Sequence, residues 1–389
     1  MELVLFDDSR RHIFLPLVYT KPVGLLRMGA FTMQQRWQKA MPAEVSFQTQ
    51  DYLAPVFGKP SGHELFVNAR LFPTASIIEA ARQLKPGEAW QHKDQLLMHR
   101  VQGDEPIEAA EWQGDEPFML HSITDVFMLN DRALRLDFEL LGKGNAFQTE
   151  ACTIIGPADQ LHVHPSARVV GAWINTTTGP VIIDADAEVM EGSMIRGPFY
   201  LGQHAQLKMG AKVYGATTIG PECKFGGEIS NSVVQGYSNK AHDGFIGNAL
   251  IGEWCNLGAD TNSSNLKNNY SEVQIFQYGE DQYVNTGLTF CGLIMGDHSK
   301  CGINTMFNTG TVVGVGANIF GGDFPEKHIP SFMWGGAAGW QEYQLSKMLD
   351  TAAKVMERRK LALRPEMMDI LTEVFRQTSG YRSIASQSQ

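Results

Sequence analysis

A six-residue apolar repeat is the feature that most restricts how this 389-residue chain can fold. Helices bury side chains with a period of 3.6 residues and strands with a period of 2, so neither explains a sustained period of six. The period predicts a solenoid of short parallel strands in which each face of a triangular coil buries one side chain. The repeat occupies Ile183, Val189, Ile195, Leu201, Leu207, Val213, Ile219 and Phe225, and it resumes at Met295, Cys301, Phe307, Val313 and Ile319. A sandwich with chance spacing would rarely fill so many positions in register.

The chain is too long for one ordinary core, and its pattern predicts three parts. Residues 1–155 alternate strand-like and helix-like segments, which favours an α/β domain with a parallel, doubly wound sheet. Within it, the segment TASIIEAARQL predicts a helix with Thr74 or Ser76 as its N-cap. Residues 156–336 are predicted to form the β-helix, and residues 337–389 a helical tail.

Two segments interrupt or end the solenoid pattern. Residues 268–287 carry no six-residue repeat and predict a loop or hairpin that projects from one coil. Residues 343–361 have helical spacing, and Pro365 is suited to the first turn of a second helix. We expect these helices to cap the end of the solenoid or to contact a partner.

Charge and composition exclude several classes of protein. A net charge of −10 argues against nucleic-acid binding, so an anionic substrate would need locally placed basic groups. No apolar run is long enough for a membrane span, and the N-terminus has no secretory pattern, so we expect a cytoplasmic protein with no membrane partner. The five cysteines lack C-x-x-C spacing, which indicates neither a disulfide framework nor a zinc ribbon.

The segment 226–270 concentrates polar residues where the regular coils are interrupted. It contains Lys240-Ala241-His242, then Phe245, Gly247-Asn248 and Ile251-Gly252, and then Asn256-Leu257-Gly258-Ala259-Asp260-Thr261 with Asn265. These motifs resemble the acetyltransferase domain of the bifunctional glucosamine-1-phosphate acetyltransferase and N-acetylglucosamine-1-phosphate uridyltransferase family. The resemblance implies a left-handed β-helix, acetyl-CoA as co-substrate, an amino-sugar phosphate as acceptor and a homotrimer.

The same resemblance implies roles for individual residues. His242 matches the catalytic histidine that takes a proton from the sugar amine, and Asn256 matches an asparagine that lines the amine and acetyl site. Further matches are substrate-binding residues, namely Lys212, Glu228, Lys240, Asn265 and Lys267, and acetyl-CoA contacts, namely Ile303, Thr305 and Gly321. Phe245 and Ser230 stand where the family has tyrosine and lysine, which leaves Lys267 or Lys240 to supply the missing charge for the sugar phosphate.

Metal chemistry is an alternative for the histidines of the solenoid. A γ-type carbonic anhydrase gathers three histidines from neighbouring coils around zinc. The candidates other than His242 are His162, His164, His204 and His298, and they do not form the close pair that such a site needs. We therefore predict no metal site there.

The N-terminal part resembles a divergent sugar-phosphate nucleotidyltransferase. The glycine-rich turn that would cradle phosphates is absent, which leaves Arg10, Arg11 and Lys21 to hold a triphosphate. Asn68 falls where the family has a metal-binding aspartate, and an amide is a poorer magnesium ligand. UTP and Mg²⁺ are therefore expected only if this domain is active, and a sugar-nucleotide-binding or purely structural domain is the alternative.

Taken together, these features predict acetyl transfer from acetyl-CoA to an amino-sugar phosphate, with glucosamine-1-phosphate as the preferred acceptor. Uridylyl transfer by the N-terminal domain stays open. The competing interpretation is a non-catalytic scaffold or sugar-nucleotide-binding protein with the same architecture.

Overall fold

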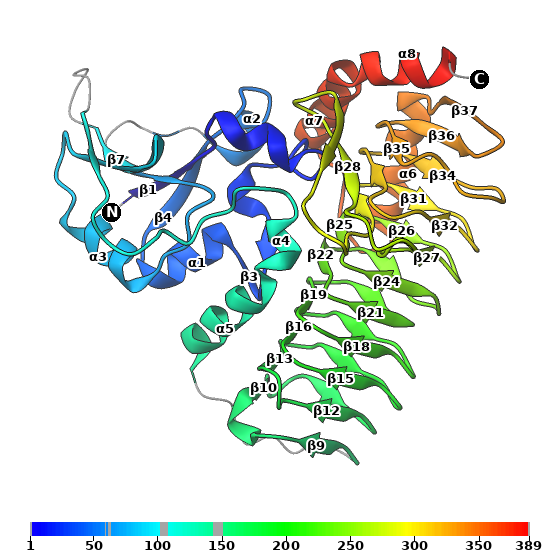
Figure 1. The fold of residues 1–389 in the computed structure, drawn as a ribbon, viewed down its shortest axis with the longest axis horizontal. Coiled ribbons are helices and arrows are strands. Elements are labelled where there is room, and N and C mark those ends of the chain that lie inside the picture. The colour runs from blue at the N-terminus through cyan, green and yellow to red at the C-terminus, as the bar shows by residue number, and fades with distance from the viewer. Residues whose placement is uncertain (1, 59, 61–63, 102–107, 143–150, 388–389) are drawn as a thin grey trace. The chain divides into compact units, whose positions relative to one another are not determined.

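The structure, a computed structural model, describes residues 2–58, 60, 64–101, 108–142 and 151–387 (Figure 1). The chain divides into two compact units. The first contains residues 1–14, 18–26 and 31–123, and the second contains residues 15–17, 27–30 and 124–389. The sequence pattern predicts domain boundaries near residues 155 and 336. These boundaries stay predictions.

The first unit is built on a mixed sheet. Its central strand, β1 (Glu2–Phe6), pairs in parallel with its neighbours on both sides. Leu3, Val4 and Leu5 are fully buried, as expected for a continuous apolar strand that is covered on both faces. In the described residues the strand order is β4 (Glu44–Gln48), β1, β5 (Leu65–Asn68), β7 (Gln95–Arg100), β6 (Ala89–His92) and β8 (Ala109–Glu111). The expected all-parallel sheet is wrong at β7, which runs antiparallel to both β5 and β6.

Short helices lie between the strands of this sheet along the chain. Helix α1 begins after Thr32, whose side chain and that of Gln35 form a reciprocal capping box. Thr74 occupies the N-cap position of α3, as predicted, but its side chain makes no capping hydrogen bond. The remaining elements here are η1 (Ser9–Phe14), η2 (Val23–Leu25), β3 (Phe31–Thr32), α1 (Met33–Ala40), α2 (Ala54–Phe57) and α3 (Ala75–Gln83). The second unit adds β2 (Arg27–Met28), α4 (Asp125–Met128) and α5 (Asn130–Leu141).

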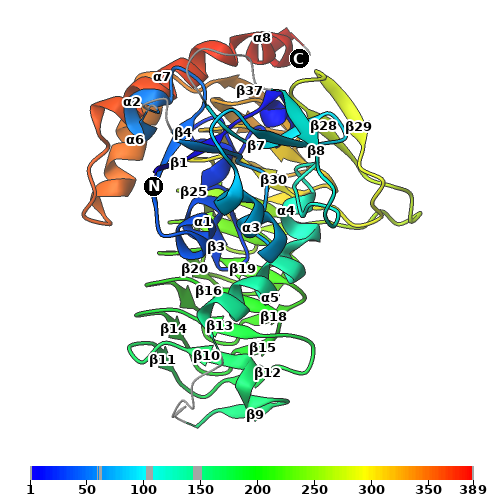
Figure 2. The same cartoon turned by 90° about the vertical axis from the view of Figure 1, so that its left-hand side faces the viewer.

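The second unit contains the predicted parallel β-solenoid, whose coils stack one on another in Figure 2. Within the described residues its strands form three faces, and each face is named by the number of strands that it contains. The nine-strand face contains β10 (Leu161–Val163), β13 (Val181–Ile183), β16 (Phe199–Leu201), β19 (Thr217–Ile219), β22 (Val233–Gly236), β25 (Leu250–Glu253), β30 (Ile294–Met295), β33 (Val312–Val313) and β35 (His328–Ile329). The ten-strand face contains β11 (Arg168–Val169), β14 (Glu188–Val189), β17 (Gln206–Leu207), β20 (Lys224–Phe225), β23 (Asn239–Lys240), β26 (Asn256–Leu257), β31 (Lys300–Cys301), β34 (Asn318–Ile319), β36 (Met333–Gly336) and β37 (Gly339–Glu342). The eight-strand face contains β9 (Thr153–Ile155), β12 (Trp173–Asn175), β15 (Met194–Arg196), β18 (Lys212–Tyr214), β21 (Glu228–Ser230), β24 (Phe245–Gly247), β27 (Asn262–Ser263) and β32 (Met306–Phe307).

The six-residue repeat corresponds to the inside of this solenoid. Every residue of the repeat named above is buried, and most have no exposed surface at all. Neighbouring coils pair in parallel throughout, for example Leu201 with Ile219 and Leu207 with Phe225. The parallel β-helix and the inward direction of the repeat are therefore confirmed, and left-handed coiling stays a prediction from the resemblance.

The predicted interruption and tail are also confirmed. The excursion forms an antiparallel hairpin of β28 (Gln274–Gln277) and β29 (Gln282–Asn285) that projects beside the coils (Figure 2). The tail forms α6 (Leu345–Glu357) and α7 (Pro365–Gln377), and Pro365 occupies the first turn of α7. A third helix, α8 (Ser379–Gln387), was not expected from the sequence.

Candidate active site

His242 lies on a corner that joins two faces of the solenoid. Residues 241–244 connect β23 of the ten-strand face to β24 of the eight-strand face. Asn256 lies on the outer side of the ten-strand face, one coil beyond Asn239. Glu228 lies on the eight-strand face, one coil before Phe245. His242, which is exposed, therefore lies on the corner between the ten-strand face, which carries Asn256, and the eight-strand face, which carries the predicted sugar contacts.

Lys240 lies inside the solenoid, directly under this corner. It pairs in register with Phe225, so it occupies an inward position that apolar residues fill in the neighbouring coils, and it has no exposed surface. Its ammonium Nζ donates to the backbone oxygens of His242 and Asp243, each at 3.0 Å. Burial lowers the pKa of Lys240 to about 8, and the Asp243 and Asp260 carboxylates oppose that change. The predicted substrate contact thus has its charge in the core, where it holds the backbone next to His242.

The corner before that of His242 is two residues shorter than its neighbours. Four residues, 208–211, separate Leu207 from Lys212, and four, 241–244, separate Lys240 from Phe245. Only Gly226 and Gly227 separate Phe225 from Glu228 in the coil between them. Strands of successive coils are about 4.8 Å apart, so the two full-length corners lie roughly 9–10 Å apart with the short glycine corner between them.

Glycine is required at Gly227 in the short corner and at Gly244 in the His242 corner. A side chain on Gly227, whose φ is +76°, would meet the backbone oxygen of Gly244 at 2.6 Å. A side chain on Gly244 would meet the backbone oxygen of Thr261 at 2.3 Å and Lys240 Nζ at 3.1 Å. Both glycines of the shortened corner are buried, so the backbone of that corner packs directly against the His242 turn.

The predicted sugar-binding residues Lys212 and Glu228 are brought together. Lys212, Glu228 and Phe245 occupy one register position in three successive coils of the eight-strand face. The Tyr214 hydroxyl donates to Glu228 Oε1 at 2.5 Å, and this bond, with burial, raises the pKa of Tyr214. Glu228 is therefore held in place by a neighbouring coil.

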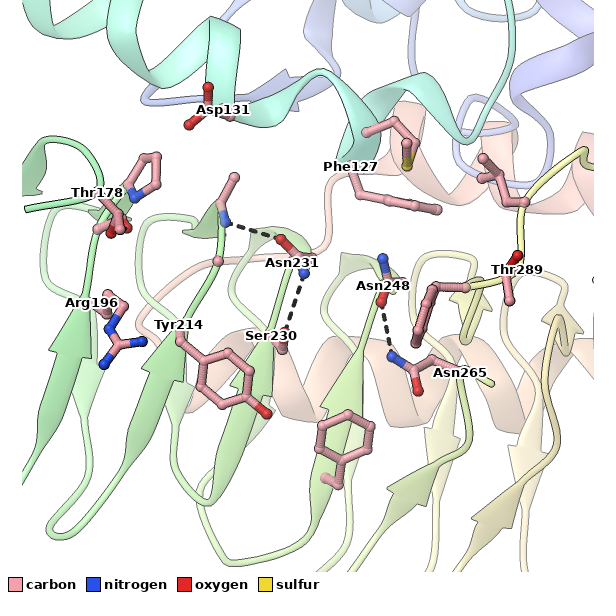
Figure 3. Close-up of a pocket in the computed structure, with 18 of the residues that line it drawn as sticks. Phe127, Asp131, Thr178, Arg196, Tyr214, Ser230, Asn231, Asn248, Asn265 and Thr289 are labelled. Carbon is pink, nitrogen blue, oxygen red and sulfur yellow. Dashed lines mark hydrogen bonds between the residues drawn. The ribbon is translucent and has the colours of Figure 1, made fainter. Parts of the chain in front are cut away.

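Asn265 lies in a separate groove along the same solenoid. The groove has a volume of about 1080 Å³, and Phe245 and Ser230 also line it (Figure 3). Asn265 Nδ2 donates to Asn248 Oδ1 at 2.8 Å, so its amide is engaged by the preceding coil. Figure 3 shows this pair facing Phe127 of α4, with Asp131 of α5 and Arg196 of β15 farther along.

Asn256 lines a second pocket, of about 560 Å³, on the ten-strand face. Ala241, the residue before His242, also lines it. Arg358 and Arg359 of the C-terminal tail form part of the wall of this pocket, a contact that no sequence pattern predicted.

The predicted acetyl-CoA contacts lie two or more coils away from His242. Asn304 N donates to Ala259 O and Asp260 N donates to Asp243 O, which places Ile303 on the same line of corners as His242. Ile303 is 68% exposed, whereas Thr305 is buried and its hydroxyl donates to Gly302 O at 2.9 Å. Gly321 is exposed, and Lys267 Nζ donates to Glu272 O at 2.6 Å at the base of the hairpin.

In the first unit, the predicted nucleotide-binding residues form part of a buried polar network. Arg11 is buried, its Nε lies 3.2 Å from Asp7 Oδ2, and its guanidinium also donates to Val18 O. Asn68 Nδ2 donates to Asp8 Oδ2 at 2.9 Å. Lys21 is buried, whereas Arg10 is exposed. Of the three basic residues, Arg10 alone presents its side chain to solvent.

The two acidic residues after β1 differ in their electrostatics. Burial raises the pKa of Asp7, and the charge of Arg11 offsets this only in part. Burial also acts to raise the pKa of Asp8, but the hydrogen bond and charge of Arg70 outweigh it and lower the pKa. Both carboxylates thus have partners within the fold, at the carboxyl end of a parallel strand where α/β proteins bind ligands.

Metal ligation and membrane insertion find no support in the described part of the chain. Among those residues, no group of three or more histidine, cysteine, aspartate or glutamate side chains is arranged to hold a metal ion. Within the same residues, every helix is too short or too polar to span a membrane. Cys223, Cys255, Cys291 and Cys301 are buried thiols, and burial raises the pKa of each, so these thiols pack in the core.

Comparison with known proteins finds a family model and several curated relatives that are similar to this chain. A family model described as sugar nucleotidyl transferase matches residues 3–146, which confirms the nucleotidyltransferase-like N-terminal region. A bifunctional sugar-1-phosphate nucleotidylyltransferase/acetyltransferase of Sulfurisphaera tokodaii is 31% identical over 146 residues, which are 37% of this chain and 36% of the relative. The bifunctional protein GlmU of Synechococcus elongatus is 25% identical over 181 residues, which are 46% of this chain and 33% of the relative.

The chain spans about a third of the length of these two curated relatives. Among solved structures, that of the polySia-specific acetyltransferase NeuO aligns over 55% of this chain and 95% of its own, with 13% identity and a TM-score of 0.30.

Proposed function

We propose that this chain, whose family-model match and bifunctional relatives support a GlmU-like family, transfers acetyl from acetyl-CoA to the amine of an amino-sugar phosphate. Glucosamine-1-phosphate is the acceptor that we propose. The observation that carries the proposal is the geometry of the His242 corner. An exposed histidine lies on the corner between the face that carries Asn256 and the face that carries Glu228, on a turn that a buried lysine holds and beside a corner that is two residues short.

In the proposed reaction the sugar amine attacks the carbonyl carbon of the thioester. His242 accepts a proton from the amine nitrogen, a role that an unprotonated imidazole nitrogen can take. The C–S bond breaks, and the proton then passes from His242 to the departing sulfur. The products are the N-acetylated sugar phosphate and CoA with a free thiol. Asn256 would orient the amine and acetyl groups, and Lys212 and Glu228 would contact the sugar.

The proposal includes a homotrimer, in which a neighbouring copy covers part of each site. Its support is an apolar strip on the eight-strand face, where Ile155, Trp173 and Met194 lie in successive coils and are 44%, 47% and 48% exposed. Monomeric proteins rarely expose contiguous apolar strips, and a repetitive flank suits a closed cyclic assembly.

The test of the proposed activity is acetyl transfer by the whole chain. Protein, acetyl-CoA and glucosamine-1-phosphate are mixed, and free thiol and N-acetylated product are both measured. We expect the two products in equal amounts. Thiol release without N-acetylated product would indicate hydrolysis, and absence of both over a range of amino-sugar phosphates would reject the function.

Uridylyl transfer by the first unit is a second candidate, because the sugar nucleotidyl transferase model covers it. UTP and Mg²⁺ are proposed as ligands only if the first unit performs this uridylyl transfer. Its triphosphate contacts would centre on Arg10, because Arg11 and Asn68 are engaged within the fold. Calorimetry of UTP in the presence of Mg²⁺, on wild type and on Arg10→Ala, tests it. Wild-type binding that the substitution weakens would support it, and absence of binding would favour a structural domain.

A further inference from the structure

The pocket that contains Asn256 has walls from two regions far apart in the sequence. One wall is the outer side of the ten-strand face, where Asn239, Asn256 and Lys300 occupy one register position in three successive coils. The other wall is Val355 near the C-terminal end of α6, together with Arg358 and Arg359 in the turn that follows the helix. Both walls belong to the solenoid unit.

The helix is fixed against the solenoid by packing and by polar contacts. Met348 and Ala352 of α6 are almost fully buried. Arg359 donates to Asn239 Oδ1 at 3.0 Å and lies 3.4 Å from Glu222 Oε2. The pocket is therefore a built feature of the fold, because buried residues of α6 and the Arg359 contacts hold its second wall in place.

The pocket collects positive charge in a chain whose net charge is −10. Its lining includes Lys224, Lys300, Arg358 and Arg359, and none of its described lining residues is acidic. Glu222 pairs with Arg359 from outside the lining and offsets one of the four charges. Burial lowers the pKa of Lys224, and the nearby charges of Arg359, Lys208 and Arg358 lower it further. Burial also lowers the pKa of Lys300. Cations that crowd together in this way repel one another, and an anion would relieve the repulsion.

Aromatic rings form the side of the pocket next to these cations. Tyr237 and Trp254 both line it, and their rings stack at 4.2 Å with an angle of 12°. Trp254 in turn stacks on His298 at 6.2 Å. Rings beside basic groups suit an organic phosphate, because the rings pack against its carbon skeleton while the cations bind its oxygens.

We propose that this pocket, completed by Arg358 and Arg359 of the turn after α6, binds a phosphate group of a small organic ligand. Arginine and lysine together are well suited to phosphate oxygens. Ala241 and Asn256 line the same pocket, so the bound ligand would extend toward the His242 corner. The identity of the ligand rests on the proposed function, which offers two sources of phosphate, the amino-sugar phosphate and acetyl-CoA. The pocket would supply the phosphate contact for which the Phe245 and Ser230 positions provide no charge.

The test compares binding by wild type and by the double variant Lys224→Gln/Arg358→Gln. Arg359 is left intact because it fixes the helix through Asn239. The matched control is Lys354→Gln, which removes a charge from an exposed residue of α6 that pairs with Asp350 and lies outside the pocket lining. Calorimetry is done with inorganic pyrophosphate, glucosamine-1-phosphate and CoA, and thermal unfolding verifies that each variant is folded.

We expect the double variant to bind at least one of the three phosphate probes about 10- to 100-fold more weakly, because two charge-assisted contacts are lost. The control should bind like wild type. Loss confined to glucosamine-1-phosphate would assign the pocket to the sugar phosphate, and loss confined to CoA would assign it to the nucleotide phosphates. Unchanged binding of all three probes, or no binding of any probe by wild type, would overturn the proposal.

Binding and turnover separate this inference from the proposed function. A wild-type protein that binds phosphate through the pocket but transfers no acetyl would retain the pocket and reject the acetyltransferase. A protein that transfers acetyl with equal efficiency in wild type and double variant would retain the acetyltransferase and reject the pocket.

Discussion

Lys240 is a charged side chain in a column of buried apolar residues, with Phe225 in the preceding coil. It replaces an apolar contact by two hydrogen bonds to the backbone next to His242. An ammonium group loses its hydration when buried, so such a residue is retained only where its partners compensate for part of that loss. Here the partners are the carbonyl groups of the turn that carries the candidate base.

The first prediction concerns the pH dependence of stability at Lys240. Its pKa in the fold is about 8, below its ordinary value of 10.5, so between these values the unfolded chain holds the extra proton. Stability rises with pH in such a window. Wild type should therefore gain about 1–3 kcal/mol relative to Lys240→Met as the pH rises from about 8 to about 10.

Urea unfolding of both proteins at about pH 7.5 and pH 10 measures this difference, in which the other titrating groups cancel. A difference in unfolding free energy that does not change with pH would contradict the buried, charged state of Lys240.

The second prediction separates the two adjacent arginines of the first unit. Arg11→Ala removes one partner of a buried ion pair with Asp7, and such a loss costs about 3–5 kcal/mol of stability. Arg10→Ala changes an exposed residue and should alter stability by less than about 0.5 kcal/mol. Denaturant unfolding of both variants tests this, and equal effects would show that Arg11 is not a structural residue.

At the scale of elements, the six-residue period was sufficient to predict the inward face of the solenoid, because one side chain per strand is buried in every coil. Helix α6, the start of α7 at Pro365 and the hairpin β28–β29 also followed from local pattern. The inward position of Lys240 could not be predicted from local pattern. Two residues are missing at Gly226–Gly227, so the period changes just before Lys240 and no longer marks it as inward.

Contacts between segments far apart in sequence could not be predicted at all. Arg359 reaches Asn239 across 120 residues, and no periodicity encodes that pairing. The buried ion pair of the first unit could not be predicted either. Arg10 and Arg11 are adjacent residues of the same type, and only the fold shows that Arg11 pairs with Asp7 while Arg10 is exposed. The antiparallel direction of β7 likewise depends on how the chain returns to the sheet.

The third prediction tests the solenoid as an element. Leu207→Asp places a carboxylate at a fully buried inward position and should cost about 3 kcal/mol or more. Met209→Asp, two residues later on a corner, changes a side chain that is 71% exposed and should change stability by less than about 0.5 kcal/mol. Thermal unfolding compares the two, and similar melting temperatures would contradict the inward assignment.

At the scale of the whole molecule, the proposed function needs an assembly. The fourth prediction is that sedimentation equilibrium gives a mass three times the 43.1 kDa of one chain. Trp173→Glu places a charge in the apolar strip of the eight-strand face and should shift the population toward monomer. A wild-type monomer at all concentrations, or a trimer that the substitution leaves unchanged, would reject this interface.

The central claim is that His242 is the general base of acetyl transfer, and the most direct measurement is the turnover of His242→Ala with acetyl-CoA and glucosamine-1-phosphate. His242 is exposed and makes no contribution to the core, so the variant should fold and bind CoA like wild type. We predict that kcat falls by about 100-fold or more, as expected when a general base is removed. A variant that keeps wild-type turnover would contradict the claim.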